Sequence, residues 1–305
     1  MKPEMEFGPE PVEIKQEKFD STWVIARKKF IKNKIAMVSL GFLILIAAIS
    51  FLTPYIWTED VTRIHTDQAN MEPSKEHYLG TDRNGRDVLL RTIHGGKVSL
   101  TIGIVSMFAV TIIGSIIGAL SGYFGGLVDN LIMRFTDFIL TIPFMVFIIV
   151  LNAIMLGYER VTGMWSLIIV FSLLGWGSVA RIVRSKILSE KENEYILAAQ
   201  SIGTKPTKII SRHLIPNVLT VIIVQATLVL AIYIVAEAGL SFIGVGVPPD
   251  IPSWGNMLME ARQTDVLKNK LWIWVPPAVC ITLTILSINF VGEGLKDAFD
   301  PKTTK

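Results

Sequence analysis

Six long stretches of the chain contain no Asp, Glu, Lys or Arg, and charged segments separate them. They lie at about 35–58, 98–128, 138–158, 161–180, 214–236 and 271–292. A helix needs roughly 20 mostly apolar residues to cross the hydrocarbon core of a bilayer, and each stretch suits that role. Apolar runs also form buried core helices, but a soluble protein rarely has six this long. The pattern predicts an all-α membrane protein with six transmembrane helices.

The basic residues favour one orientation of these helices. With both termini on one side, the segments on that side hold 18 Lys and Arg residues against 10 on the other. Cytoplasmic segments carry such an excess, so both termini are expected in the cytoplasm. Residues 59–96 are then an extracytoplasmic loop, 97–292 a five-helix core and 293–305 a cytoplasmic tail. The basic residues cluster at membrane edges, which gives no sign of nucleic-acid binding.

The polar segment 1–34 precedes the first span and contains an amphipathic pattern. Phe19, Trp23, Ala26 and Phe30 recur at helical spacing, while basic residues occupy the other side. This spacing predicts an interfacial helix with its apolar face in the headgroup region. The alternative is a simple basic flank to the first span. No cleavage signal precedes that span, so it is expected to remain as an anchor.

A loop at about 185–216 interrupts the apolar pattern with EYILAAQSIGTKPTKIISRHLIPN at 194–217. Ser189 and Glu192 have the spacing of a capping box, which indicates a helix start. Gly203 is placed to end that helix, and a second short helix is expected at 207–214, ending before Pro216. The expected unit is a helix, a glycine turn and a helix in the cytoplasm.

The alanines and the glycine of this loop carry a resemblance to a known family. The pattern A-A-x-x-x-G at Ala198, Ala199 and Gly203, followed by H-L-I-P at 213–216, resembles the cytoplasmic loop of bacterial ABC importer permeases. The resemblance implies a coupling helix that docks on an ATPase subunit. Leu197 departs from the pattern, because a glutamate often stands there. The implied docking residues are Glu194, Tyr195, Ala198, Ala199, Ile202, Gly203 and Lys205, with Tyr195, Ala199 and Ile202 expected on one face.

Three further segments resemble the second permease subunit of oligopeptide and dipeptide importers. They are HYLGTDRNGRDVLLRTIHGGKVSL at 77–100, LSFIGVGVPPDIPSWGNML at 240–258 and NFVGEGLKDAFDP at 289–301. The resemblance implies a type I ABC importer permease fold in the bacterial cytoplasmic membrane. It also implies a second permease subunit, two ATPase subunits and an extracytoplasmic substrate-binding protein as partners. Nickel and glutathione importers share these motifs, so those substrates stay open.

The motifs of catalysis and of nucleotide binding are missing from the sequence. No G-x-x-x-x-G-K-[ST] pattern occurs, so ATP and Mg would be used by partner subunits and this chain is not expected to be an enzyme. Asp82, Asn84 and Asp87 could suggest a metal loop, but the glycine is misplaced for an EF-hand. A turn held by ion pairs fits better. No metal or cofactor is therefore expected in this chain.

Three charged residues lie within or beside the apolar stretches. Arg134 and Asp137 are three residues apart and are expected to form one paired unit. Glu237 is expected near the outer boundary of its span, either as a functional acid or as an interface-level acid bonded to nearby backbone. A self-contained channel or ion-coupled carrier is the alternative function, but it predicts ionisable residues at the membrane midplane. The span centres here are free of charge.

Overall fold

The computed structural model describes residues 22–57, 59–156 and 163–300, and within these ranges the regular structure is helical. Five helices are long and apolar enough to cross a membrane, and one sharply bent pair brings the number to six. This confirms the expected all-α chain. The spans are α2 (Lys34–Ile56), α3 (Val88–Phe124), α4 with α5 (Gly126–Thr141 and Phe144–Leu156), α6 (Met164–Lys191), α9 (Ile215–Ile243) and α12 (Leu271–Phe299).

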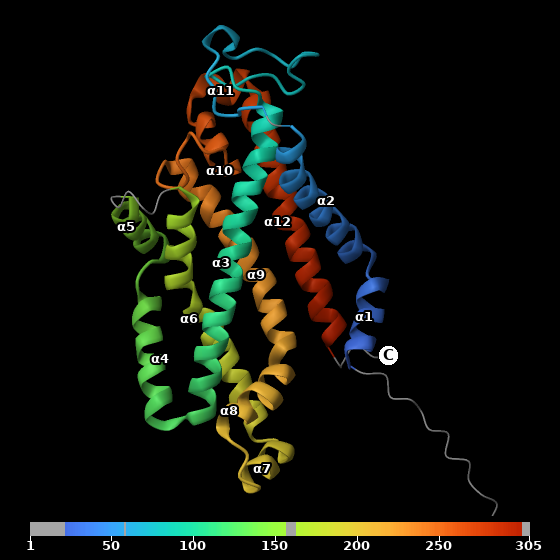
Figure 1. Cartoon of the computed structure of the whole chain (residues 1–305), viewed down its shortest axis with the longest axis vertical. Coiled ribbons are helices and arrows are strands. Elements are labelled where there is room, and N and C mark those ends of the chain that lie inside the picture. The colour runs from blue at the N-terminus through green and yellow to red at the C-terminus, as the bar shows by residue number, and fades with distance from the viewer. Residues whose placement is uncertain (1–21, 58, 157–162, 301–305) are drawn as a thin grey trace, which may run out of the picture.

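The shorter elements gather at the two ends of the bundle (Figure 1). The segment before α3 lies at one end with α10 (Trp254–Leu258) and α11 (Thr264–Asn269), which we call the loop end. The helix α7 (Glu194–Ser201) lies at the opposite end, which we call the α7 end. The remaining short elements are α1 (Thr22–Lys32), α8 (Pro206–Ile209), a π-helical segment Ile210–Leu214, and 3-10 turns at Thr66–Gln68 and Met259–Arg262.

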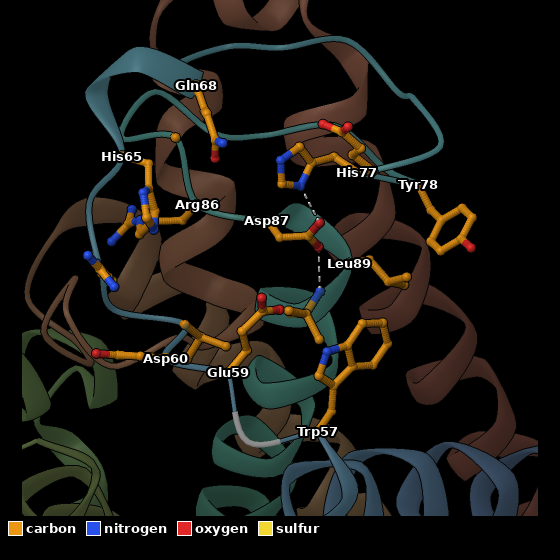
Figure 2. Close-up of a pocket in the computed structure, with 15 residues that line it drawn as sticks. Trp57, Glu59, Asp60, His65, Gln68, His77, Tyr78, Arg86, Asp87 and Leu89 are labelled. Carbon is orange, nitrogen blue, oxygen red and sulfur yellow. Dashed lines mark hydrogen bonds and ion pairs between the residues drawn. The ribbon is translucent and has the colours of Figure 1, made fainter.

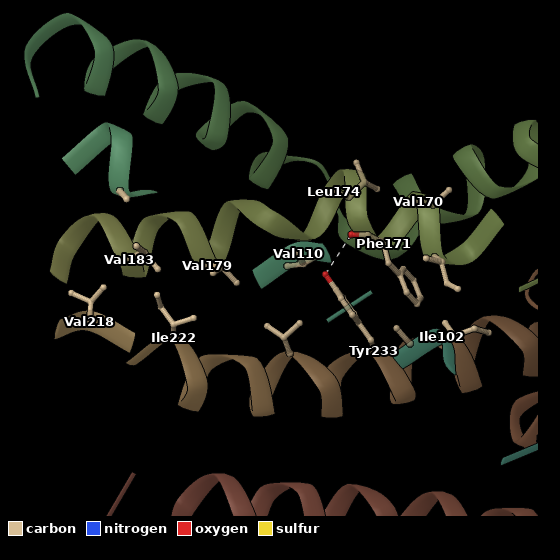
Figure 3. Close-up of a cluster of buried hydrophobic side chains, with 14 of the residues drawn as sticks. Ile102, Val110, Val170, Phe171, Leu174, Val179, Val183, Val218, Ile222 and Tyr233 are labelled. Atoms are coloured by element: carbon tan, nitrogen blue, oxygen red, sulfur yellow. Dashed lines mark hydrogen bonds between the residues drawn. The ribbon is translucent and has the colours of Figure 1, made fainter. Parts of the chain in front are cut away.

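The core of the bundle is formed by α3, α6 and α9, whose buried apolar side chains make one cluster (Figure 3). The rings of Phe171 on α6 and Tyr233 on α9 stack at 4.8 Å between centroids. Small residues let α3 and α6 approach closely: a Cβ atom on Gly118 would lie 2.4 Å from the carbonyl oxygen of Ala180. Such small-residue contacts are typical of helix pairs in membranes, where close backbone packing stabilises association.

The third apolar stretch is not one kinked helix but two helices at 86° to each other. A proline inside a helix kinks or breaks it, and the break between α4 and α5 falls at Pro143. The backbone of Ile142, directly before the proline, is extended (φ −78°, ψ 130°), because the proline ring disfavours the helical conformation of the preceding residue. The helix on its N-terminal side, α4, begins at Gly126, so it includes Arg134 and Asp137.

The amphipathic segment forms a separate helix, α1, joined to α2 at Asn33. Its apolar face is partly covered by the end of α12, while Trp23 remains 48% exposed. The rings of Trp23 and Phe299 meet edge to face at 5.1 Å, and Ala26 is buried. The Lys29 ammonium also donates to the Asp300 carbonyl over 3.2 Å. Phe19 lies outside the described residues.

Candidate functional site

The helix α7 begins later than the sequence suggested. Ser189 lies inside α6, which runs to Lys191, so the expected capping box is wrong. The N-cap of α7 is Asn193, whose carbonyl accepts from the backbone N–H of Ile196 and of Leu197. The loop was expected to begin at about residue 185, but α6 continues to Lys191 and ends at its C-cap, Glu192.

Two neighbouring side chains attach α7 to the bundle. Ile196 is fully buried and belongs to the core cluster of α3, α6 and α9. The Tyr195 hydroxyl lies 3.0 Å from the Glu190 carboxylate, to which it donates, and accepts from the Asn217 amide over 2.7 Å. Partial burial and the neighbouring carboxylate raise the pKa of Tyr195. The helix is therefore held to the ends of both α6 and α9.

Gly203 ends α7 in the way its sequence position predicts. Its backbone is left-handed, with φ at +76°. The N–H of Gly203 bonds to the carbonyl of Gln200, and the N–H of Thr204 to that of Ala199. These two bonds form a Schellman motif, which satisfies carbonyl groups that the helix end leaves open. The helix stop is confirmed.

Apart from Tyr195, the exposed residues of α7 and its C-cap form a stripe with the spacing i, i+3, i+4, i+7 and i+8. It consists of Glu194, Leu197, Ala198, Ser201 and Ile202, which we call the docking face. Leu197 is 49% exposed and Ile202 83% exposed, so both present apolar surface to solvent.

Tyr195, Ala199 and Ile202 follow the spacing i, i+4, i+7 and so lie on one side of the helix, but they differ in burial, and Tyr195 is 42% exposed. Ala199 is half-buried and packs against the core cluster, whereas Ile202 points away from it. Gly203 and Lys205 are exposed beside the docking face. Sequence reasoning missed Ser201 and treated Leu197 only as a departure from a pattern. Placing residues 194–202 on a helical wheel, with Ile196 on the buried side, would have put both Ser201 and Leu197 on the exposed side.

The chain after Gly203 does not form a second separate helix, contrary to expectation. Pro206 starts α8, where its missing N–H costs nothing. The helix then continues through the π-helical segment into α9 without stopping before Pro216. The N–H of Ile215 reaches back to the carbonyl of Ile210, and one wide turn of this kind accommodates a proline inside a continuous helix. The helix α7 is thus joined by the short turn at 202–205 to a helix that continues into a membrane span.

The charged residues of α4 pair with α6 and not with each other. Asp137 binds Arg181 at 2.6 Å, so the expected Arg134–Asp137 unit is wrong. The side chain of Arg134 is exposed and has no hydrogen bond or ion pair within the described part of the chain. A second, less exposed pair joins Asp129 to Arg184, and Ser121 on α3 donates to the same carboxylate over 2.5 Å.

Glu237 is fully buried near the loop end of α9. Its carboxylate accepts from the hydroxyls of Ser99 and Ser241, each over 2.8 Å. The Ser99 hydroxyl in turn accepts from the backbone N–H of Trp254 over 3.1 Å. The interface-level alternative required bonds from Glu237 to nearby backbone, but the carboxylate bonds to two serine side chains. Through Ser99 it fixes α10 between α3 and α9.

The loop end contains a polar cavity of about 470 Å³ above the start of α3 (Figure 2). Asp87 connects its parts: one oxygen caps α3 at the N–H of Leu90, and the other lies 2.8 Å from the His77 ring. The neighbouring TDRNGRD loop is a turn held by Asp82, which accepts from the backbone N–H groups of Asn84 and Arg86. Among the described residues no cluster of His, Cys, Asp or Glu could hold a metal ion.

Comparison with known proteins agrees with this architecture. Residues 114–305 match the family described as binding-protein-dependent transport system inner membrane component. Residues 21–73 match the N-terminal transmembrane domain of oligopeptide transport permease C. A putative peptide permease protein of Brucella suis is 39% identical over 92% of both chains. The oligopeptide transport system permease protein OppC of Haemophilus influenzae is 40% identical over 92% of this chain and 89% of its own.

A solved structure shares the fold. An inward-facing structure of the MetNI methionine ABC transporter superposes with a TM-score of 0.57 at 18% identity, over 70% of this chain and 98% of the other.

Proposed function

Since the chain belongs to the family of inner membrane components of binding-protein-dependent transport systems, we propose that it forms half of the translocation pathway of an ATP-driven peptide importer. The observation that supports this proposal is the docking face. An amphipathic helix at the tip of the bundle, held by Ile196 and Tyr195, presents Leu197 and Ile202 to solvent, in the spacing that a helix uses to enter a groove on a partner.

The partner for that face would be an ATPase subunit. The sequence has no phosphate-binding loop of its own, so the free energy for uphill transport comes from another chain. A force on α7 would reach the membrane through Asn217 and the continuous helix from Pro206 to Ile243. Two ATPase subunits and a second, homologous permease subunit complete the assembly in this proposal.

The orientation follows from the basic residues. The α7 end and both termini face the cytoplasm, and the loop end faces outward. An extracytoplasmic binding protein would deliver substrate to the loop end, where the polar cavity and the rim of the TDRNGRD turn are accessible. Neither ATP nor Mg would bind this chain.

The substrate class proposed is short peptides, because the relatives named as peptide permeases align over nearly the whole chain. The test is uptake by proteoliposomes that contain this chain with its partner subunits. Labelled di-, tri- and pentapeptides, nickel ions and glutathione would be compared as substrates, with and without ATP. ATP-dependent uptake of peptides is expected. Uptake of only nickel or only glutathione would overturn the peptide assignment, and uptake by this chain alone would show a self-contained carrier.

A further inference from the structure

The surface of α4 is divided into two exposed stripes of opposite character. One is polar and consists of Asn130, Arg134, Asp137 and Thr141, which we call the polar stripe. The other is apolar and includes Leu131, Phe135 and Phe138. Both follow helical spacing, so each faces a single direction. Lipid matches the apolar stripe, but the polar stripe requires a different neighbour.

The polar surface continues from α4 onto α6. Arg181 reaches across to Asp137 at 2.6 Å, and these side chains remain 53% and 61% exposed. Ser178 and Ser185 lie three residues before and four residues after Arg181, on the same exposed face of α6. The two helices together form a polar surface within segments that are otherwise long and apolar enough to span a membrane.

This surface differs from the other ion pair between the same helices. Asp129 and Arg184 are mostly covered, and Ser121 from α3 completes their hydrogen bonding. That pair holds three helices together. The Asp137–Arg181 pair is eight residues further along α4, or about 12 Å by helical rise, and receives no third partner from the described residues. Its open side is available to solvent or to a solute.

Ionisable side chains within spans face a protein interior or a water-filled cavity, because exposure to hydrocarbon is costly. A protein interface would require partners for Arg134 as well as for the open side of the pair, whereas water satisfies all of them. Arg134 and Arg181 offer donors to a carboxylate, and Asp137 offers an acceptor to an ammonium group. The surface therefore matches a solute that carries both charges.

We propose that the polar stripe of α4, with Ser178, Arg181 and Ser185 of α6, lines the cytoplasmic half of the aqueous path through which peptides with charged termini pass. This inference rests on the proposed function and orientation. The low density of fixed charge suits weak, transient contacts, which a transported solute needs in order to leave. The apolar stripe beside it faces lipid or the second permease subunit.

The test uses matched pairs of neighbouring positions in the assembled transporter. Cys280, the one native cysteine, is replaced by alanine, and single cysteines are introduced as Asn130→Cys, Leu131→Cys, Thr141→Cys and Leu140→Cys. Within each pair the depth differs by only about 1.5 Å. A charged methanethiosulfonate reagent is added to inside-out vesicles, and modification is measured as a rate.

The stripe positions Asn130→Cys and Thr141→Cys are expected to react about tenfold faster or more than their neighbours, because water permits the reactive thiolate and hydrocarbon does not. Saturating dipeptide with ATP is expected to slow the reaction at Thr141→Cys. Equal rates within both pairs, or no reaction at any stripe position, would overturn the inference. Peptide uptake by the cysteine-free parent is measured separately. Loss of uptake there rejects the proposed function, while the labelling pattern alone decides whether the stripe lines a path.

Discussion

The side-chain amide of Asn217 donates a hydrogen bond to the Tyr195 hydroxyl over 2.7 Å, and this contact joins the docking helix to the beginning of the span α9. The same hydroxyl lies 3.0 Å from Glu190 at the end of α6. In the proposed assembly, movement of α7 by a docked partner would therefore be transmitted to two spans at once. Each such bond contributes about 0.5–1.5 kcal/mol, which is enough to change how a docking event is coupled to the membrane.

The Tyr195 contact predicts non-additive effects. Tyr195→Phe is expected to lower ATP-driven uptake several-fold while the ATPase subunits stay bound, because the docking face is intact but the links of α7 to both α9 and α6 are lost. Asn217→Ala removes only the link to α9, so its effect should be no larger, and the double variant should lose little more than Tyr195→Phe alone. The measurement is uptake together with ATPase co-purification. Additive losses in the double variant would show that the two residues act separately.

The docking face predicts a loss of partner binding. Leu197→Asp and Ile202→Asp should each weaken binding of the ATPase subunits about tenfold or more, since each places a charge where an apolar groove is expected. Thr207→Asp is the matched control, because that residue is also exposed in this loop but lies outside the face. Affinity is measured with purified subunits in detergent. Equal binding by all three variants would remove α7 from the interface.

Ala199 serves as an internal contrast to that face. It packs against the core cluster, so Ala199→Trp is expected to destabilise the chain by overpacking, about 1–3 kcal/mol. The thermal midpoint of the solubilised complex should fall, whereas Leu197→Asp and Ile202→Asp should leave it nearly unchanged.

Gly203 predicts a conformational effect without a steric one. A Cβ atom there would meet no atom within 4 Å, but the backbone φ is +76°. Gly203→Val is therefore expected to cost about 1–2 kcal/mol and to disturb the direction of the chain into α8. Gly203→Asn should be nearly neutral, because asparagine tolerates this conformation. Thermal stability and uptake are compared for both variants, and equal effects would mean that side-chain size decides.

Topology is tested by labelling from outside the cell. In a Cys280→Ala background, Ser74→Cys at the loop end should react with an impermeant reagent, and Ser201→Cys on α7 should not. Both native serines are exposed, so access across the membrane is the variable. The reverse pattern would invert the proposed orientation.

A pH effect is expected at the loop end. Burial, reinforced by the Asp82 carboxylate, raises the pKa of Glu260 above its usual value, although Arg86 opposes this shift. Because the folded-state pKa is raised, the stability contribution of Glu260 is fully present below the ordinary glutamate pKa and is lost as pH rises through the raised value. Glu260→Gln should reduce that pH dependence of the thermal midpoint. An unchanged pH profile would show that the carboxyl does not titrate in this range.

The sequence by itself determined the six spans, the break at Pro143 and the helix stop at Gly203. Each depends on local rules: a length of apolar chain, the restriction before a proline, and a left-handed position that favours glycine. The family motifs could be recognised for the same reason, since they are short and contiguous.

Only the tertiary structure decided which face of each helix is covered. Hydropathy does not distinguish a side chain in lipid from one in a protein interior, because both surroundings are apolar. For that reason the sequence did not show that Trp23 of α1 meets Phe299 of α12, or that Ala199 packs against the core cluster. Likewise Asp137 found Arg181, 44 residues away, because pairing depends on which helices meet, and contacts between distant segments set that.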